Sequence, residues 1–128
     1  MFTIGSKGQA ETIVTAENTA KSMGSGDLLV YATPSMVALM ESAARNSVQN
    51  ALPPGTGTVG TLMNVKHLTA SPIHMKITAE SERLEEDGRR LVFRVCASDE
   101  QGLIGEGIHE RFIIDNEKFM AKANGKLG

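Results

Sequence analysis

The chain has a single cysteine, Cys96, and no apolar run long enough to cross a membrane. One cysteine excludes a disulfide within the chain, and its position in an apolar run is typical of a small core residue rather than a nucleophile. Residues 1–15 lack the basic flank and the apolar stretch of a secretion signal. We therefore expect a cytoplasmic protein without a membrane segment.

Excess positive charge and several common functional motifs are also missing. The 13 Lys and Arg residues are dispersed and outnumbered by 15 Asp and Glu, which disfavours a nucleic-acid surface. There is no Gly-rich phosphate loop followed by Lys and no Gly-x-Ser-x-Gly elbow. His67, His74 and His109 lie on separate expected strands without metal-ligand spacing, so we expect no metal site. The length predicts one domain, residues 1–128, with a flexible N-terminus through Gly8.

The clearest local pattern predicts a helix from about Ser35 to Leu52. Thr33 is a good N-cap, Pro34 suits the first helical position, and residues 53–55 (Pro-Pro-Gly) end the helix. Apolar residues recur along it at helical spacing: Met36, Val37, Met40, Ala44, Val48 and Ala51. The helix is more apolar than a typical surface helix, which predicts that most of its circumference is covered.

A short strand at residues 11–15 precedes this helix, and four strands follow it. Residues 91–97 form one of these strands. Alternation defines the expected buried faces of the other three, which are Val59, Met63, Val65 and His67, then Ile73, Met75, Ile77 and Ala79, and finally Ile104, Ile108, Phe112 and Ile114. Short turns between the strands favour antiparallel pairing. One sheet must then bury one helix, which predicts an α+β hot-dog fold, an antiparallel sheet of about five strands around one long central helix. Other α+β sandwiches are the alternative.

Three residues are candidates for catalysis, and each also has an ordinary structural explanation. Glu41 lies at the edge of the helix's apolar arc, where it would face a cleft or form a surface pair with Arg45. His67 points to the apolar side of its strand, as a general base or as a core histidine. Thr33 is explained by capping, yet free N–H groups at a helix start also stabilise developing negative charge. Capping therefore does not argue against catalysis.

An ordered set of segments resembles the fluoroacetyl-CoA thioesterase family, a branch of the hot-dog thioesterases. The likeness runs from about Val14 to Lys122 without large gaps. Its segments are residues 32–41 (ATPSMVALME), Gly60-Thr61, Val65-Lys66-His67, Ala70-Ser71-Pro72, residues 107–111 (GIHER) and residues 117–122 (EKFMAK). No single segment is specific, whereas the ordered set is.

The resemblance implies a CoA thioester substrate and a homodimer or tetramer with active sites at the subunit interface. It implies that Thr33, Glu41 and His67 form the catalytic set, and that Gly60 and Arg111 contribute to substrate selection. No cofactor is implied, because CoA is part of the substrate. Arg111 has the opposite parity to Phe112, so the strand pattern places it away from the local core.

The reaction implied is hydrolysis of a small or medium acyl-CoA. His67 would act as general base on water or on Thr33, and Glu41 would orient His67 or act as the nucleophile itself. The helix start, with a backbone N–H around Gly60, would hold the oxyanion. The alternatives are a hot-dog hydratase or dehydratase, although the Gly-Asp-x-Asn-Pro-x-His pattern is missing, and a non-catalytic acyl-CoA-binding protein.

One departure from the family concerns the segment before the helix. Members specific for fluoroacetyl-CoA carry phenylalanines there that gate the pocket, whereas residues 24–30 have none, and Asp27 stands near one of those places. The sequence therefore predicts a pocket open to acyl groups other than fluoroacetyl.

Overall fold

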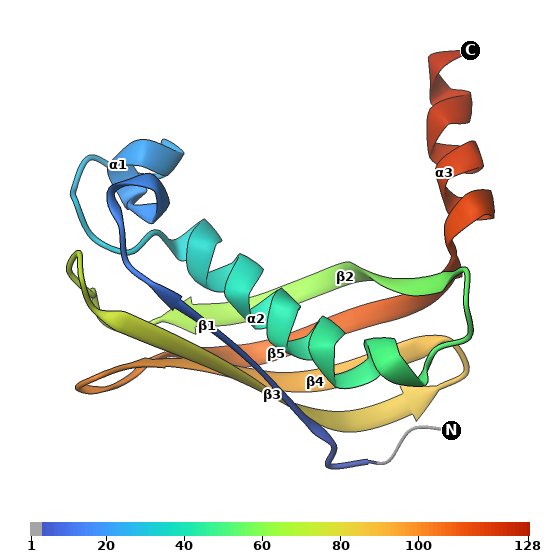
Figure 1. Cartoon of the computed structure of the whole chain (residues 1–128), viewed down its shortest axis with the longest axis horizontal. Coiled ribbons are helices and arrows are strands. Elements are labelled where there is room, and N and C mark those ends of the chain that lie inside the picture. Colours follow the sequence, from blue (N-terminus) through green and yellow to red (C-terminus); the bar gives the residue numbers. More distant parts are fainter. Residues whose placement is uncertain (1–3) are drawn as a thin grey trace.

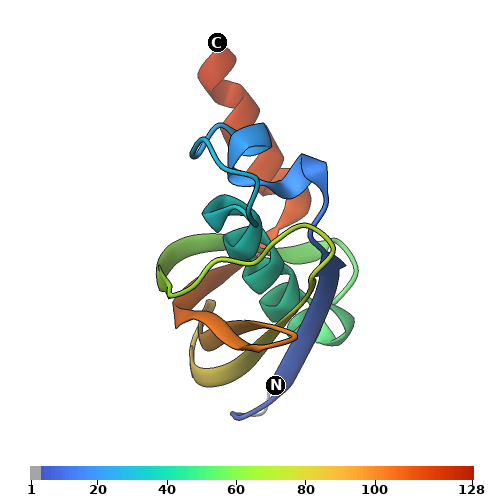
Figure 2. The same cartoon turned by 90° about the vertical axis from the view of Figure 1, so that its left-hand side faces the viewer.

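The computed structural model describes residues 4–128 as one antiparallel sheet with a helix lying across it (Figures 1 and 2). The strands pair in the order β1-β3-β4-β5-β2. Their bounds are β1 Lys7–Ile13, β2 Thr56–His67, β3 Lys76–Asp87, β4 Arg90–Asp99 and β5 Gly102–Asp115. The helices are α1 Ala20–Met23, α2 Thr33–Val48 and α3 Asn116–Asn124, with short 3₁₀ turns at Ala16–Asn18, Gln49–Ala51 and Gly125–Leu127. This is the predicted hot-dog arrangement, in which the sheet curls around α2.

The core forms where one stripe of α2 meets the inner face of the sheet. The helix contributes Met36, Met40, Ala43, Ala44 and Val48, all buried, and the sheet contributes Ile77, Ala79, Leu91, Phe93, Val95, Ala97 and Ile104. The opposite side of α2 is exposed at Ala38, Ser42 and Arg45. The sequence predicted that most of the helix circumference would be covered. In the single chain, only one stripe of the helix is buried.

The helix boundaries differ from the expected ones at both ends. α2 begins at Thr33 with Ala32 as its N-cap, and no side chain caps it, so the expectation that Thr33 is the cap was wrong. Pro34, expected at the first helical position, is the second residue of the helix and still lies in its first turn. The α-helix ends at Val48 and continues only as a 3₁₀ turn to Ala51. The hydroxyl of Thr33 is consequently available for another partner.

The first strand begins earlier than the sequence pattern indicated. Met1 to Thr3 of the expected flexible N-terminus lie outside the described residues. After them, the Gly5 N–H donates to the Arg83 carbonyl at 2.8 Å, and Lys7 and Gly8 already pair with β3. Alternation of apolar residues did not reveal this start because Lys7, Gln9 and Glu11 are exposed and the inward-facing residues between them, Gly8 and Ala10, are small.

The buried face of the last strand was predicted with the wrong parity. Ile104 is buried as expected, but Phe112 is 39% exposed, whereas His109 and Arg111 are 1% and 5% exposed. In β2 a bulge between Gly60 and Leu62 reverses the alternation. Met63, Val65 and His67 therefore point inward as predicted, while Val59, which pairs with Phe112, does not.

We predict that Gly8→Ala destabilises the fold. A Cβ atom at Gly8 would overlap the Ala43 carbonyl of α2 and lie 2.7 Å from the Ser47 Cβ, so the helix would have to move off β1. Overpacking of this kind costs about 1–3 kcal/mol, measurable as a lower urea midpoint. Gly125→Ala is the matched control, because its Cβ would meet no atom within 4 Å. Equal midpoints for the two variants would contradict this account of the β1–α2 contact.

Candidate active site

Thr33 and His67 meet where the start of α2 lies beside the end of β2. The Thr33 Oγ1 is 2.7 Å from the His67 Nδ1. Thr33 is the first residue of α2 and His67 is the last residue of β2, so two separate elements fix the pair. Because Ala32 is the N-cap and the Thr33 hydroxyl makes no capping bond, capping does not account for this threonine. The hydroxyl instead belongs to a threonine–histidine pair at a helix N-terminus.

The surroundings of His67 favour its neutral, proton-accepting form. Its side chain is half-buried, and its Nε2 is buried without a hydrogen-bond partner among the described residues. Burial lowers the pKa of His67 below the usual 6.5, and the Thr69 backbone acts in the opposite direction. A neutral imidazole next to a hydroxyl can take up the hydroxyl proton and return it.

Glu41 lies in a second group, beneath the middle of α2. Its Oε2 is 3.7 Å from the Arg111 Nη1, and a Cβ added to Gly60 would lie 2.5 Å from the same oxygen. Arg111 belongs to β5, and its side chain is held by Thr58 of the neighbouring strand β2. The Arg111 Nε donates to the Thr58 Oγ1 at 2.8 Å, and the Arg111 Nη2 donates to the Thr58 carbonyl at 2.9 Å. Burial lowers the pKa of Arg111, and the charge of Glu41 opposes that shift.

The same group contains His109, a residue that the sequence analysis did not select. Its Nδ1 lies 2.8 Å from the Leu62 carbonyl, its Nε2 lies 3.2 Å from the Arg111 Nη1, and its ring stacks on Phe93. Burial and the neighbouring Arg111 lower the pKa of His109. The neutral ring then donates from Nδ1 to Leu62 and accepts from Arg111 at Nε2. His109 shares the parity of Arg111, and that signal would have found it had the inner face been assigned correctly.

The three predicted catalytic residues do not form one contact network within the chain. Glu41 lies two helical turns after Thr33, about 12 Å along the axis at 1.5 Å per residue. Within residues 4–128, no hydrogen bond or ion pair joins Glu41 to Thr33 or His67. The structure therefore brings Thr33 together with His67, and Glu41 together with Gly60 and Arg111.

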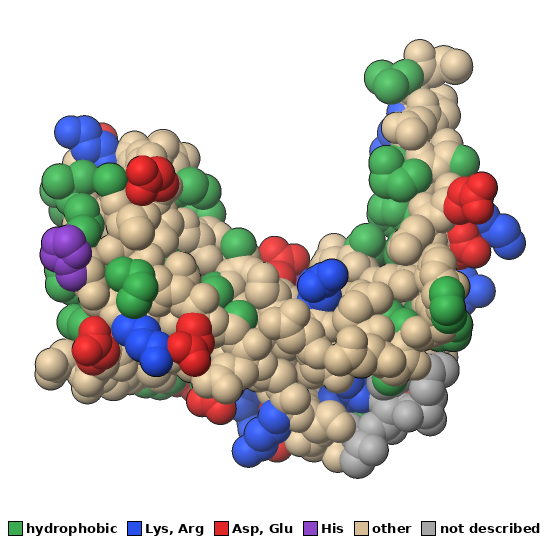
Figure 3. Space-filling model, in the orientation of Figure 1, with side chains coloured by type: hydrophobic (Ala, Val, Ile, Leu, Met, Phe, Trp, Pro, Cys, Tyr) green, Lys and Arg blue, Asp and Glu red, His purple; other side chains and the backbone are tan. Residues whose placement is uncertain are grey.

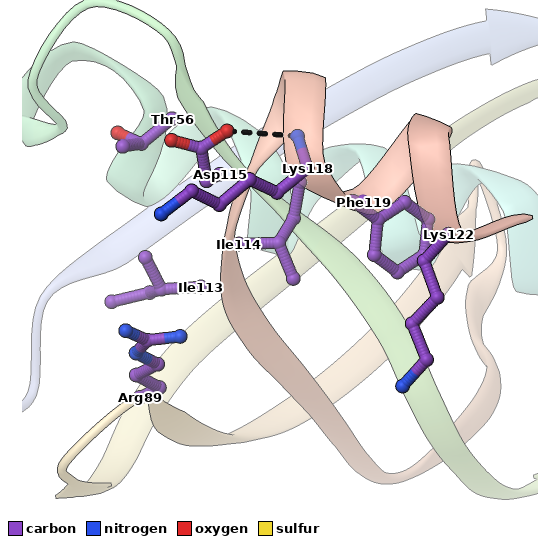
Figure 4. Close-up of a pocket in the computed structure, with 8 residues that line it drawn as sticks. All are labelled: Thr56, Arg89, Ile113, Ile114, Asp115, Lys118, Phe119 and Lys122. Atoms are coloured by element: carbon purple, nitrogen blue, oxygen red, sulfur yellow. Dashed lines mark hydrogen bonds between the residues drawn. The ribbon is translucent and has the colours of Figure 1, made fainter.

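Two surface cavities differ in their distance from the threonine–histidine pair. A cavity of about 390 Å³ adjoins the threonine–histidine pair and is lined by Ala20, Ser25, Val30, Tyr31, Thr33, His67, Leu68, Thr69 and Ala70. A groove of about 470 Å³ lies at the other end of the sheet, where Arg89, Lys118 and Lys122 surround Ile113 and Phe119 (Figure 4). The larger groove is remote from the pair in the same chain, so the smaller cavity is the better candidate for the reacting group.

Comparisons with known proteins agree on one family. The model of the fluoroacetyl-CoA-specific thioesterase family matches residues 14–117. A fluoroacetyl-CoA thioesterase of Streptantibioticus cattleyicolor is 43% identical over 97 residues, which cover 76% of this chain and 70% of that protein. A solved fluoroacetyl-CoA thioesterase superposes with a TM-score of 0.93 at 34% identity over 98% of both chains. A thioesterase superfamily member from Thermus thermophilus gives 0.87 at 31% identity, covering 95% of this chain and 90% of the other.

The curled antiparallel sheet around one long helix defines a hot-dog fold, and the comparisons show that the chain belongs to the thioesterase class of that fold. A hot-dog-like protein from Thermanaerovibrio acidaminovorans shares this fold with a TM-score of 0.89 at 20% identity, over 99% of this chain and 94% of the other. Within that class, the chain belongs to the fluoroacetyl-CoA-specific thioesterase family. Among the described residues, no helix is both long and apolar enough to span a membrane.

We predict that Gly60→Ala disables the Glu41 group without unfolding the protein. The added Cβ would lie 2.5 Å from the flexible end of Glu41 and 3.2 Å from the His109 Cε1, with no backbone atom among its nearest contacts, so the melting temperature should fall only slightly. Moving a carboxylate by about 1 Å can cost up to about 10² in rate. Thioester hydrolysis and the melting temperature should be measured on the same preparation. Unchanged turnover would show that the position of Glu41 does not matter for the reaction.

Proposed function

We propose that the chain hydrolyses small and medium acyl-CoA thioesters to a free acid and CoA, with Thr33, Glu41 and His67 as its catalytic residues. The observation that carries the proposal is the 2.7 Å contact between the Thr33 hydroxyl and the His67 imidazole at the start of α2. Family membership supplies the reaction class, and the pair supplies a nucleophile and a base.

The reaction begins with proton transfer to His67. The proton comes from the Thr33 hydroxyl or from a water molecule, and the oxygen left behind attacks the thioester carbonyl. N–H groups at the start of α2 stabilise the oxyanion. Collapse breaks the C–S bond, and His67 returns its proton to the departing CoA sulfur. If Thr33 is the nucleophile, water then cleaves the acyl ester by the same steps in a second cycle.

Glu41 and Arg111 contribute charged groups to the site in which negative charge develops on the oxyanion. A buried guanidinium stabilises negative charge more strongly than an exposed one, because water screens it less. Arg111 is held in place by Thr58 and His109, so it is preorganised beside Glu41 and Gly60. We assign substrate selection to Gly60 and Arg111. These two residues also hold the Glu41 carboxylate in position.

The acyl group is not restricted to fluoroacetyl in this proposal. Residues 24–30 contain no phenylalanine, and Val30 and Ser25 border the cavity beside the pair. A threonine-to-serine variant of the solved fluoroacetyl-CoA thioesterase has been crystallised with acetyl-CoA. We therefore place acetyl-CoA and longer acyl-CoA thioesters among the substrates. The working form is a cytoplasmic homodimer without a metal or cofactor.

The functional test is a panel of acyl-CoA thioesters assayed for release of free thiol. We expect turnover of acetyl-CoA and short-chain acyl-CoA as well as fluoroacetyl-CoA. Hydrolysis confined to fluoroacetyl-CoA would contradict the inference drawn from residues 24–30. Binding of acyl-CoA without thiol release would indicate the non-catalytic alternative, and hydration of an added enoyl-CoA would indicate the hydratase.

We predict that His67→Gln lowers turnover by on the order of 10²–10⁴, the usual cost of losing a general base. Glutamine keeps bulk and hydrogen bonding but cannot take up a proton near neutral pH. His74→Gln is the matched control, because His74 is exposed and lies outside both residue groups. The melting temperature of each variant separates a catalytic defect from an unfolded one. Full turnover in His67→Gln would remove the general-base assignment and leave Glu41 as the base.

A further inference from the structure

The C-terminal helix α3 touches the described part of its own chain only near its start, beside β5. None of its nine residues is buried, and it projects away from the sheet on the same side as α1 (Figures 1 and 2). Three apolar residues of α3 and one from the 3₁₀ turn after it share one side, the α3 stripe: Phe119, Met120, Ala123 and Leu127. Phe119, Met120 and Leu127 are 42%, 52% and 90% exposed. Isolated helices this short are unstable in water, so α3 needs a surface to pack on.

The sheet also has an uncovered edge, on β2. The two edge strands are β1 and β2. Helix α2 lies against β1, where the Asn46 Nδ2 donates to the Gln9 carbonyl at 3.0 Å. The outer edge of β2 has no strand beside it, and Leu62 on this strand is 42% exposed. An open strand of 12 residues readily pairs with another strand, and a second copy of the chain offers an identical edge.

Symmetry then decides which regions of the two chains meet. A two-fold dimer that joins two β2 edges in one sheet must pair them antiparallel. In such a dimer the Thr56 end of one β2 would lie beside the His67 end of the other. α3 begins at this end, because Asp115, the residue before it, pairs with Thr56. Each α3 would thus lie near the threonine–histidine pair of the other chain, about 36 Å from its own pair at 3.3 Å per strand residue.

The surface found at that place suits the α3 stripe. Residues 23–30, the α1 loop, expose Met23 (49%), Leu28 (69%) and Leu29 (55%). The space-filling view shows apolar side chains on the inner side of α3 and a deep hollow between it and the α1 region (Figure 3). Charge agrees as well: residues 116–128 carry three lysines and one glutamate, whereas residues 16–30 carry two acids and one lysine.

We propose that α3 of each chain packs on the α1 loop of a second copy, and that the α3 stripe closes the cavity beside the partner's threonine–histidine pair. The occupant of the hollow is thus a second copy of this chain. The apolar wall around the acyl group comes from the partner, in place of the phenylalanines that residues 24–30 lack. This inference rests on the proposed function for its catalytic consequence, but its geometry can be tested without substrate.

Cross-linking tests the geometry. In the double variant Leu28→Cys/Leu127→Cys, a short bis-maleimide should join two chains into a covalent dimer on a reducing gel. Leu28 and Leu127 lie near opposite ends of β2, so the link cannot form within a chain. Leu28→Cys/Glu117→Cys is the matched control, because Glu117 lies off the stripe, and the single variants report the background from Cys96.

A covalent dimer from the Leu28/Leu127 pair, with little from the Leu28/Glu117 control, is the expected result. No cross-link in a protein that light scattering shows to be dimeric would overturn the proposal, and so would a monomer at micromolar concentration. Neither result depends on catalysis, so failure here is separate from failure of the proposed function.

Complementation between two variant chains tests whether the α3 stripe of one chain lines the cavity of the other. Met120→Ser/Leu127→Ser should lower kcat/KM for acyl-CoA roughly tenfold or more through loss of apolar contact. Glu117→Ser/Ala121→Ser, on the other side of α3, should leave it unchanged. Co-expression of the stripe variant with His67→Gln should restore activity, because the intact pair of one chain is then covered by the intact α3 of the other. Random pairing predicts about a quarter of wild-type kcat/KM at low substrate.

The alternatives have different outcomes in the same mixture. If α3 served its own chain, every intact pair would carry an altered α3, and the mixture would show no gain over the average of its parents. If the stripe variant alone were fully active, α3 would not wall the site. Either result would overturn the proposal, while wild-type hydrolysis would still support the proposed function.

Discussion

The packing of α2 against the curled sheet is the contact on which both residue groups depend. Met36 and Met40 fix the helix over the strands, and the Tyr31 hydroxyl donates to the Ser35 carbonyl at 3.1 Å just before them. This sets the helix start beside the end of β2, which brings Thr33 to His67. The same register places Glu41 above Gly60 two turns later. A slide or rotation of α2 would therefore separate both groups at once.

The inner face of the sheet is polar at its centre because the site occupies it. Burying a guanidinium and an imidazole there costs desolvation free energy that hydrogen bonds must offset. Thr58 supplies two acceptors to Arg111, and the Leu62 carbonyl accepts from His109. A neutral scaffold holds the arginine, and Glu41 is its nearby counter-charge at 3.7 Å.

Local periodicity predicted the elements of this fold well, and the register of its strands less well. The spacing of Met36, Met40 and Val48 identified α2, and alternation placed His67 on the inner face. Alternation failed at the β2 bulge, because one extra residue near Thr61 reverses every later side chain without changing composition. It failed again in β5, where Phe112 is apolar yet faces outward. The family resemblance selected Arg111 against the strand pattern, and the structure shows that the strand pattern was at fault.

The scarcity of aromatic residues limits how this chain can enclose a substrate. It has four phenylalanines, one tyrosine and no tryptophan. Among the described residues, Tyr31 and Phe93 are committed to the core, and Phe112 lies on the outer face. Phe119, on α3, is the remaining aromatic side chain, and it lies at the far end of the sheet from its own threonine–histidine pair. In the described residues, the sheet and α2 form two layers, and beyond them only the α1 region and residues 68–70 border the cavity beside that pair. Phe119, Met120 and Leu127 are exposed at the other end of the sheet. In the proposed dimer, two-fold symmetry brings these apolar side chains of one chain to the threonine–histidine pair of the other.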